Sequence, residues 1–103
     1  MSRELRLRGA ALSDLRRARG WYQREAPHMI DAFLEEFRAV ISSIEERPLM
    51  YPAIAGQVRR ALMTRFHYAI YFTAEEETIM VYAIFHQARH EGRWKQRLPR
   101  EKP

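Results

Sequence analysis

The stretch RFHYAIYFTAEEETIMVYAIFH, residues 65–86, holds two apolar runs separated by a short polar link. In each run, apolar or aromatic side chains recur at every second position: Phe66, Tyr68, Ile70 and Phe72, then Ile79, Val81, Ala83 and Phe85. This period, carried by β-branched and aromatic residues, is typical of β-strands. The link AEEE after Thr73 is short and polar enough for a hairpin. The stretch therefore predicts two antiparallel strands, each with one apolar face.

The segment before this hairpin has the same period, and a loop precedes it. QVRRALMT, residues 57–64, predicts a further strand. In RPLMYP, residues 47–52, Pro48 and Pro52 cannot continue a helix. We therefore expect a loop followed by three consecutive strands.

Ahead of the loop the period changes to that of an α-helix. The apolar residues recur at helical offsets, namely Ile30, Phe33, Leu34, Phe37, Ile41 and Ile44. The acidic residues Asp31, Glu35, Glu36 and Glu45 occupy other faces. This pattern predicts a helix that packs on a core.

The chain after Gly9 predicts a second amphipathic helix, which precedes the first in sequence. Its apolar stripe consists of Ala11, Leu15, Ala18 and Tyr22. Gly20 within it is unfavourable by about 1 kcal/mol relative to alanine. Pro27 disfavours helical geometry at Ala26 and suits the first turn of a new helix, so we expect a break there. Helices joined by so short a break are expected to form an antiparallel αα-hairpin.

The remaining N-terminal segment, RELRLRG at residues 3–9, places Leu5 and Leu7 on one face of an extended chain and predicts a short strand. The element order is then β-α-α-β-β-β. An α+β fold follows, with an antiparallel sheet and the αα-hairpin packed on one face. We expect one domain over residues 1–103, with a basic C-terminal tail from about residue 89.

Composition limits the classes of function. The net charge is +5 and the pI is near 10.1, which suggests an anionic partner. Without cysteine, a disulfide framework and a thiolate metal site are both excluded. No apolar run approaches a membrane span, and MSRELRLRGAAL lacks the apolar core of a signal peptide, so a cytoplasmic location is expected.

The segment FHQARHEGRWKQR, residues 85–97, concentrates charge after the last strand. Trp94 between Arg93 and Lys95 fits a stacking platform for a base, or a lid over the sheet edge with Arg89 against it; the packed arrangement is favoured. Charges in this position should contribute little to the core. Changing Arg93 and Arg97 to alanine is therefore expected to alter stability by no more than about 1 kcal/mol.

The ordered set of these segments resembles the RelE/ParE toxins of bacterial toxin–antitoxin pairs. It consists of LSDLRRARGWY, the helix that ends in ERPLMYP, RRALMTRFHYAIYF, IMVYAIFHQARH and WKQR. The resemblance spans almost the whole chain. It implies a β-α-α-β-β-β fold and a small cytoplasmic poison neutralised by a cognate antitoxin. RelE-like members cleave messenger RNA on the ribosome, whereas ParE-like members poison DNA gyrase.

A ribonuclease needs groups that activate the ribose 2′-hydroxyl, stabilise a phosphorane-like charge and protonate the leaving oxygen. The residues that could supply them are Arg59, Arg60, Arg65, His67, His86 and Arg89. Two positions depart from the ribonuclease pattern. Ala69 follows Tyr68 where ribonuclease members often carry arginine, and Trp94 occupies a position often held by tyrosine or histidine. Since indole cannot shuttle a proton, the pattern is closer to the ParE branch.

The leading interpretation is therefore a ParE-like toxin that inhibits DNA gyrase or another topoisomerase. The residues assigned to target binding are Arg59, Arg60, Arg89, Arg93, Trp94 and Arg97. An antitoxin whose C-terminal segment wraps the basic surface is the expected partner, in a hetero-oligomer. One alternative is a ribosome-dependent endoribonuclease that uses Arg65, His67, His86 and Arg89; the other is a non-toxic module that keeps only antitoxin binding.

No cofactor is expected, and neither is a metal site. His86 and His90 have a spacing that could hold zinc on a helix, but no cysteine or third histidine stands nearby. His86 more simply hydrogen-bonds at the end of a strand, and His67 should point away from the core.

Overall fold

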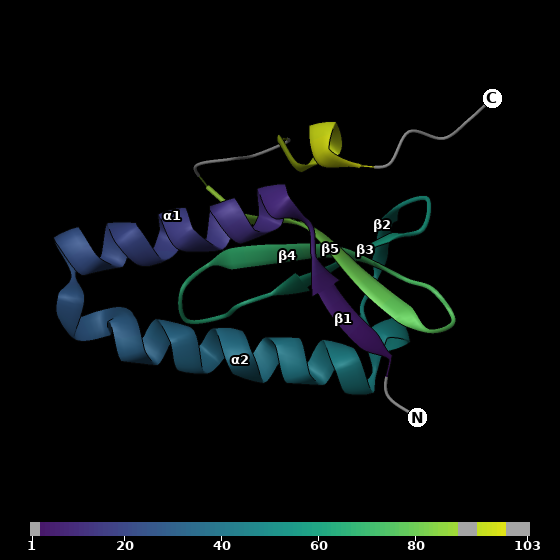
Figure 1. The fold of residues 1–103 in the computed structure, drawn as a ribbon, viewed down its shortest axis with the longest axis horizontal. Helices are drawn as coiled ribbons and strands as arrows, with labels where there is room; N and C mark the ends of the chain where they lie inside the picture. The colour runs from purple at the N-terminus through teal and green to yellow at the C-terminus, as the bar shows by residue number, and fades with distance from the viewer. Residues whose placement is uncertain (1–2, 89–92, 99–103) are drawn as a thin grey trace.

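The computed structural model describes residues 3–88 and 93–98. Its helices and strands follow in the order β1 Glu4–Leu7, α1 Gly9–Glu25, α2 Ile30–Glu46, β2 Ala53–Ala55, β3 Val58–Leu62, β4 Tyr68–Ala74 and β5 Thr78–His86. Short 3-10 helices are η1 Pro27–Met29, η2 Pro48–Met50 and η3 Arg93–Arg97. The α+β class is confirmed, and the helical hairpin lies against one face of the sheet (Figure 1).

The predicted break between the helices lies at Ala26, whose φ of −151° leaves the helical region. Its backbone N–H still donates to the Tyr22 carbonyl, at 2.8 Å, so the last turn of α1 is closed. Pro27 then begins η1, where its missing N–H is not needed. The chain reverses there, and α1 and α2 run antiparallel (Figure 1).

The helices bury side chains of different size. α1 places the small residues Ala11 and Ala18 against the sheet, so its backbone approaches β5 closely. α2 buries large residues, of which Phe33 is fully enclosed. The Phe33 ring lies 4.9 Å from Tyr22 and 5.4 Å from Phe66, measured between ring centroids. This aromatic cluster joins both helices to the β3–β4 connection, and burial of one such ring stabilises the fold by about 2–3 kcal/mol.

Within the described residues the sheet has five strands in the order β1-β5-β4-β3-β2. The expectation of a wholly antiparallel sheet is wrong in one respect, because β1 pairs with β5 in parallel, from Glu4 opposite Thr78 to Leu7 opposite Val81. β1 and β5 are joined through the rest of the fold rather than by a turn. No local turn therefore fixes their relative direction, and the sequence pattern did not reveal it.

A short strand, β2, adds to the three strands expected after the loop. It pairs with β3 across a tight turn in which Gly56 has a φ of 54°. Glycine adopts this left-handed conformation without steric cost. β3, β4 and β5 follow as antiparallel neighbours, as predicted.

β5 contains a bulge that changes which face its residues occupy. Phe72 pairs with Val81 but Tyr71 pairs with Ala83, so Tyr82 is an extra residue. The expected single face of β5 is therefore wrong beyond Val81. Ile79 and Val81 pack in the core under the helices, whereas Ala83 and Phe85 belong to a second cluster on the opposite face.

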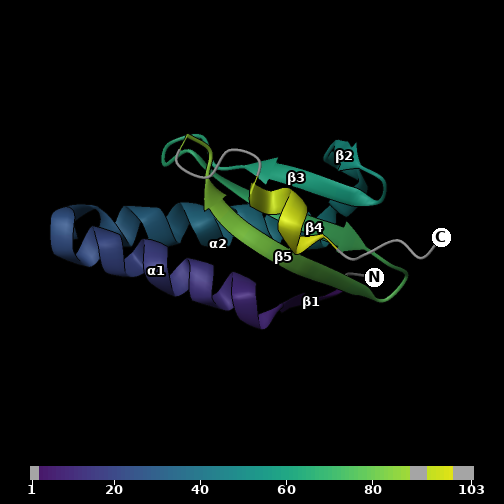
Figure 2. The ribbon, with the colours of Figure 1, turned by 90° about the horizontal axis from the view of Figure 1, so that it is seen from above.

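That second cluster explains why β4 is buried on both faces rather than one. Val58, Ala69 and Tyr71 join Ala83 and Phe85 there, and Trp94 and Leu98 pack against them. η3 thus covers the face of the sheet opposite the helices (Figure 2). In the described part of the chain, no helix has the length and apolar character needed to cross a bilayer.

Candidate functional site

The β3–β4 connection places Arg65 and His67 at one end of the sheet, and both side chains are exposed. The Glu36 carboxylate of α2 holds this turn: it accepts hydrogen bonds from the Arg65 and Phe66 backbone N–H groups at 3.2 and 3.3 Å, and from Thr64 Oγ1 at 3.1 Å. His67 has a φ of 56°, and its carbonyl accepts from the Gln87 N–H at 2.9 Å. The prediction that His67 points away from the core is confirmed.

His86 ends β5 opposite Tyr68, and its ring lies edge-on to the Tyr68 ring, 5.2 Å away. The Ala88 N–H donates to His86 Nδ1 at 3.2 Å, which agrees with a strand-end histidine engaged in local hydrogen bonding. Arg65, His67 and His86 therefore come from adjacent segments at the same end of the sheet. Arg89, the fourth residue of the endoribonuclease alternative, lies outside the described residues, as does His90.

Arg59 and Arg60, both assigned to target binding, point to opposite faces of β3. Arg59 Nη1 donates to the carbonyl oxygens of Tyr51 and Leu49, and so ties η2 to the sheet. Arg60 pairs with Tyr71 across the strands. Burial raises the pKa of the Tyr71 hydroxyl, and a hydrogen bond and the positive charge of Arg60 partly counter the increase.

Trp94 packs rather than projects. Its ring stacks on Tyr71 at a centroid distance of 5.2 Å and an interplanar angle of 11°. The Lys95 Nζ atom lies 5.7 Å from the centroid of the Trp94 ring. The expectation that Trp94 packs is thus confirmed, but it packs on the face of the sheet rather than over its edge, and the expected contact with Arg89 lies outside the described residues. The backbone of Arg93 begins η3, but its side chain, like Arg89, is not among the described parts of the structure.

Arg97 is held by Asp14 of α1. Arg97 Nη1 and Nη2 donate to the two Asp14 carboxylate oxygens at 2.9 and 3.1 Å, and its guanidinium lies 4.9 Å from the centre of the Phe85 ring. The Asp14 side chain is 1% exposed. The expectation that Arg97 contributes little to stability is therefore wrong, because its removal leaves a buried carboxylate without its main partner.

Asp14 was not singled out from the sequence as a structural residue, although its position on α1 indicated that it would be buried. It lies three residues after Ala11 and four before Ala18, on the apolar stripe of α1. A carboxylate on a buried stripe needs a compensating donor. Nothing in the local pattern pointed to Arg97, which is 83 residues away.

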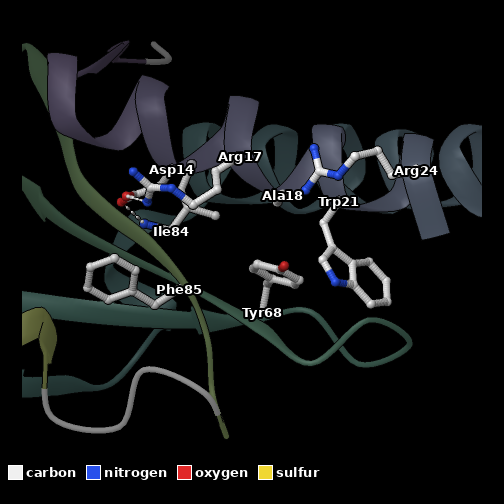
Figure 3. Close-up of a pocket in the computed structure, with 8 residues that line it drawn as sticks. All are labelled: Asp14, Arg17, Ala18, Trp21, Arg24, Tyr68, Ile84 and Phe85. Atoms are coloured by element: carbon white, nitrogen blue, oxygen red, sulfur yellow. Dashed lines mark hydrogen bonds and ion pairs between the residues drawn. The ribbon is translucent and has the colours of Figure 1, made fainter. Parts of the chain in front are cut away.

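A cleft of about 280 Å³ lies between α1 and the strands β4 and β5 (Figure 3). Its lining comes from both sides: Asp14, Arg17, Ala18, Trp21 and Arg24 from α1, with Tyr68, Ile84 and Phe85 from the sheet. Tyr68 and Trp21 lie at the same end of the cleft (Figure 3). Arg17, Trp21 and Arg24 have the helical spacing i, i+4, i+7, a pattern visible in the sequence but not assigned there to a site.

The cleft combines an apolar floor with cationic side chains. The Arg17 side chain is 66% exposed and reaches Asp14 Oδ1 at 3.4 Å, which is a weak contact. The Arg24 side chain lies close to Gly20: a Cβ atom built on Gly20 would be 3.3 Å from Arg24 Nη1. Such a surface suits a ligand that offers an apolar group next to carboxylates. Among the described residues, no group of three His, Asp or Glu side chains is placed to hold a metal ion.

Comparisons with known proteins identify relatives. Residues 5–91 match the family described as ParE toxin of type II toxin-antitoxin system, parDE. A solved structure described as the chromosomal ParDE TA system from P. aeruginosa superposes with a TM-score of 0.70 at 15% sequence identity, covering 82% of this chain and 96% of that chain. At this identity the superposition shows a shared fold. A search of curated proteins gave no match. The matched range ends before η3 begins.

Proposed function

Because this chain belongs to the ParE toxin family of type II toxin–antitoxin systems, we propose that it inhibits DNA gyrase or a related topoisomerase and is neutralised by a cognate antitoxin. The family match over residues 5–91 carries this proposal. The proposed site of action is the cytoplasm, where such a target is found.

The geometry supports a toxin that acts by binding rather than by catalysis. The resemblance places Trp94 at a position often held by a catalytic tyrosine or histidine, but an indole cannot shuttle a proton, and this indole is stacked on Tyr71. His86 Nδ1 already accepts a hydrogen bond from Ala88. The Nδ1 atom of His86 is therefore engaged locally, and the stacked indole of Trp94 is not arranged as a general acid or base.

For the antitoxin, the cleft beside α1 offers the matching chemistry. Arg17 and Arg24 favour carboxylates, while Ala18 and Ile84 favour an apolar side chain between them. We propose that an acidic segment of the antitoxin with an apolar anchor binds there and orders on contact. A toxin–antitoxin hetero-oligomer follows from this arrangement.

The deciding experiment measures two targets side by side. Purified protein is added to a gyrase supercoiling assay and, separately, to a translating extract in which messenger RNA ends are mapped. We expect loss of supercoiling with intact transcripts, and recovery when antitoxin is added. Cleavage within translated codons would instead establish the endoribonuclease alternative, and absence of both effects would leave an antitoxin-binding module.

A variant sharpens the comparison. Arg65→Ala combined with His67→Ala removes exposed residues that the ribonuclease alternative requires. Under the gyrase proposal this variant keeps its toxicity to within about threefold, since neither residue is assigned to that interaction. A loss of two or more orders of magnitude would favour RNA cleavage.

A further inference from the structure

The strand β5 has an open edge along its second half. β1 pairs with β5 only as far as Val81, and the Arg8 N–H closes this ladder on the Val81 carbonyl at 3.0 Å. From Tyr82 to His86 no strand of the described chain lies on that side of β5. Backbone polar groups on such an edge need other partners, because a buried unpaired N–H or C=O is costly.

Asp14 and Arg97 supply those partners. Asp14 Oδ2 accepts from the Ile84 N–H at 3.1 Å, and Arg97 Nη1 donates to the Tyr82 carbonyl at 3.3 Å. The two side chains also bind each other through both carboxylate oxygens. An ion pair thus occupies the position that a neighbouring strand would take.

The same ion pair fixes the position of η3. The Arg97 side chain is 29% exposed and has α1, the Tyr82 carbonyl and the Phe85 ring around its guanidinium. Since a buried carboxylate without its counter-ion is strongly unfavourable, Asp14 holds the end of η3 in place. The rest of η3, with Lys95 beside Trp94, is then oriented from this anchor.

We propose that Asp14 is a positioning residue, which binds Arg97, locks the segment 93–97 across the open end of β5 and thereby orients Lys95 toward the target. The inference rests on the proposed function, because it assigns target contact to this segment. The Asp14 side chain is only 1% exposed, so its proposed effect on the target is exerted through η3.

The first measurement reports the placement of η3 without any target. In a Trp21→Phe background, Trp94 is the remaining tryptophan and its fluorescence reports whether it is shielded on Tyr71. We expect Asp14→Asn and Arg97→Met each to raise acrylamide quenching of Trp94 by about twofold or more, because the anchor is lost. The control Asp31→Asn, an exposed carboxylate on α2, should leave quenching unchanged.

The second measurement separates positioning from simple loss of stability. Arg97→Met and a core variant, Ile44→Val, are compared at a temperature where equal fractions are folded. We expect Arg97→Met to lose toxicity by about tenfold or more relative to Ile44→Val, with Arg97→Lys partly restored because it keeps the charge but not the paired geometry.

Two results would overturn the proposal: Trp94 that stays shielded in both Asp14→Asn and Arg97→Met, or toxicity of Arg97→Met equal to that of Ile44→Val. Should Asp14→Asn fail to fold, Arg97→Met tests the same anchor from the surface side. If the wild-type protein does not inhibit gyrase, the proposed function fails, whereas the quenching comparison still decides whether Asp14 places η3.

Discussion

Tyr71 links three features at the scale of a single residue: it stacks under Trp94, pairs with Arg60 and has a pKa raised by burial. A raised pKa means that the folded protein favours the neutral phenol. The associated stability is complete below the ordinary tyrosine pKa of about 10 and is lost as the pH rises through the higher pKa of the folded state.

We therefore expect the wild-type protein to lose stability relative to Tyr71→Phe as the pH is raised above about 10. Urea unfolding at neutral pH and at alkaline pH measures the difference, and the difference between the phenol absorbance titrations of the wild-type protein and Tyr71→Phe isolates the titration of Tyr71 among the five tyrosines. If the stability difference between the two proteins stays constant across this range, the Tyr71 hydroxyl is not desolvated as described.

Trp94 contributes to stability through its contact with the sheet. Replacement by alanine removes the stacked ring from the second cluster and exposes Tyr71. We expect Trp94→Ala to lower the free energy of unfolding by about 3 kcal/mol, measured by thermal or urea denaturation. Trp94→Phe, which keeps an aromatic ring, should recover more than half of that loss; an alanine variant with unchanged melting would show that the ring is not packed.

At the scale of an element, Gly20 lowers the helix propensity of α1 and leaves room for the Arg24 side chain beside the cleft. Alanine at this position favours the helix by about 1 kcal/mol, while its Cβ meets only the flexible end of Arg24. We expect Gly20→Ala to raise the free energy of unfolding by about 0.5–1 kcal/mol and to displace Arg24, so that affinity for the antitoxin falls. Denaturation and titration with antitoxin measure the two effects; Gly9→Ala, at the first residue of α1 with open space around it, is the control.

The Glu36 side chain stabilises the turn between β3 and β4. This carboxylate on α2 accepts hydrogen bonds from the Arg65 and Phe66 N–H groups and from the Thr64 hydroxyl. We expect Glu36→Ala to destabilise the protein by about 1–3 kcal/mol and to speed hydrogen exchange at the Arg65 and Phe66 amides. Glu35→Ala, an exposed neighbour, should change neither quantity.

The spacing of apolar residues and the positions of the prolines were enough to predict α1, α2 and the three consecutive strands, because each of these elements depends on residues close together in the sequence. The parallel direction of β1 was not predictable, since no turn joins it to β5. The bulge at Tyr82 was invisible because every residue from Val81 to Phe85 is apolar or aromatic, so the pattern does not show which alternate residues share a face. Of the cleft, neither Arg17 nor Arg24 was assigned to a site from the sequence, and the pairing of Arg97 with Asp14 required the chain to be folded.

For the whole molecule, the uneven distribution of charge should control the rate of association. The net charge is +5, and α1 carries Arg16, Arg17, Arg19 and Arg24, whereas α2 is predominantly acidic. An acidic antitoxin segment is steered toward α1, so we expect the association rate constant to fall by about tenfold between about 0.05 M and 0.5 M salt. Stopped-flow mixing provides the measurement. A rate constant unchanged over this range would exclude electrostatic steering.

The bulge at Tyr82 has a consequence for comparison with other sequences. Residues 83 and 85 face η3 only because of the extra residue, and in a relative without it the corresponding positions would face the helices. An alignment drawn without a gap there would equate residues from opposite sides of the sheet. Substitution patterns at the end of β5 are therefore interpretable only when a single-residue gap is placed at the bulge.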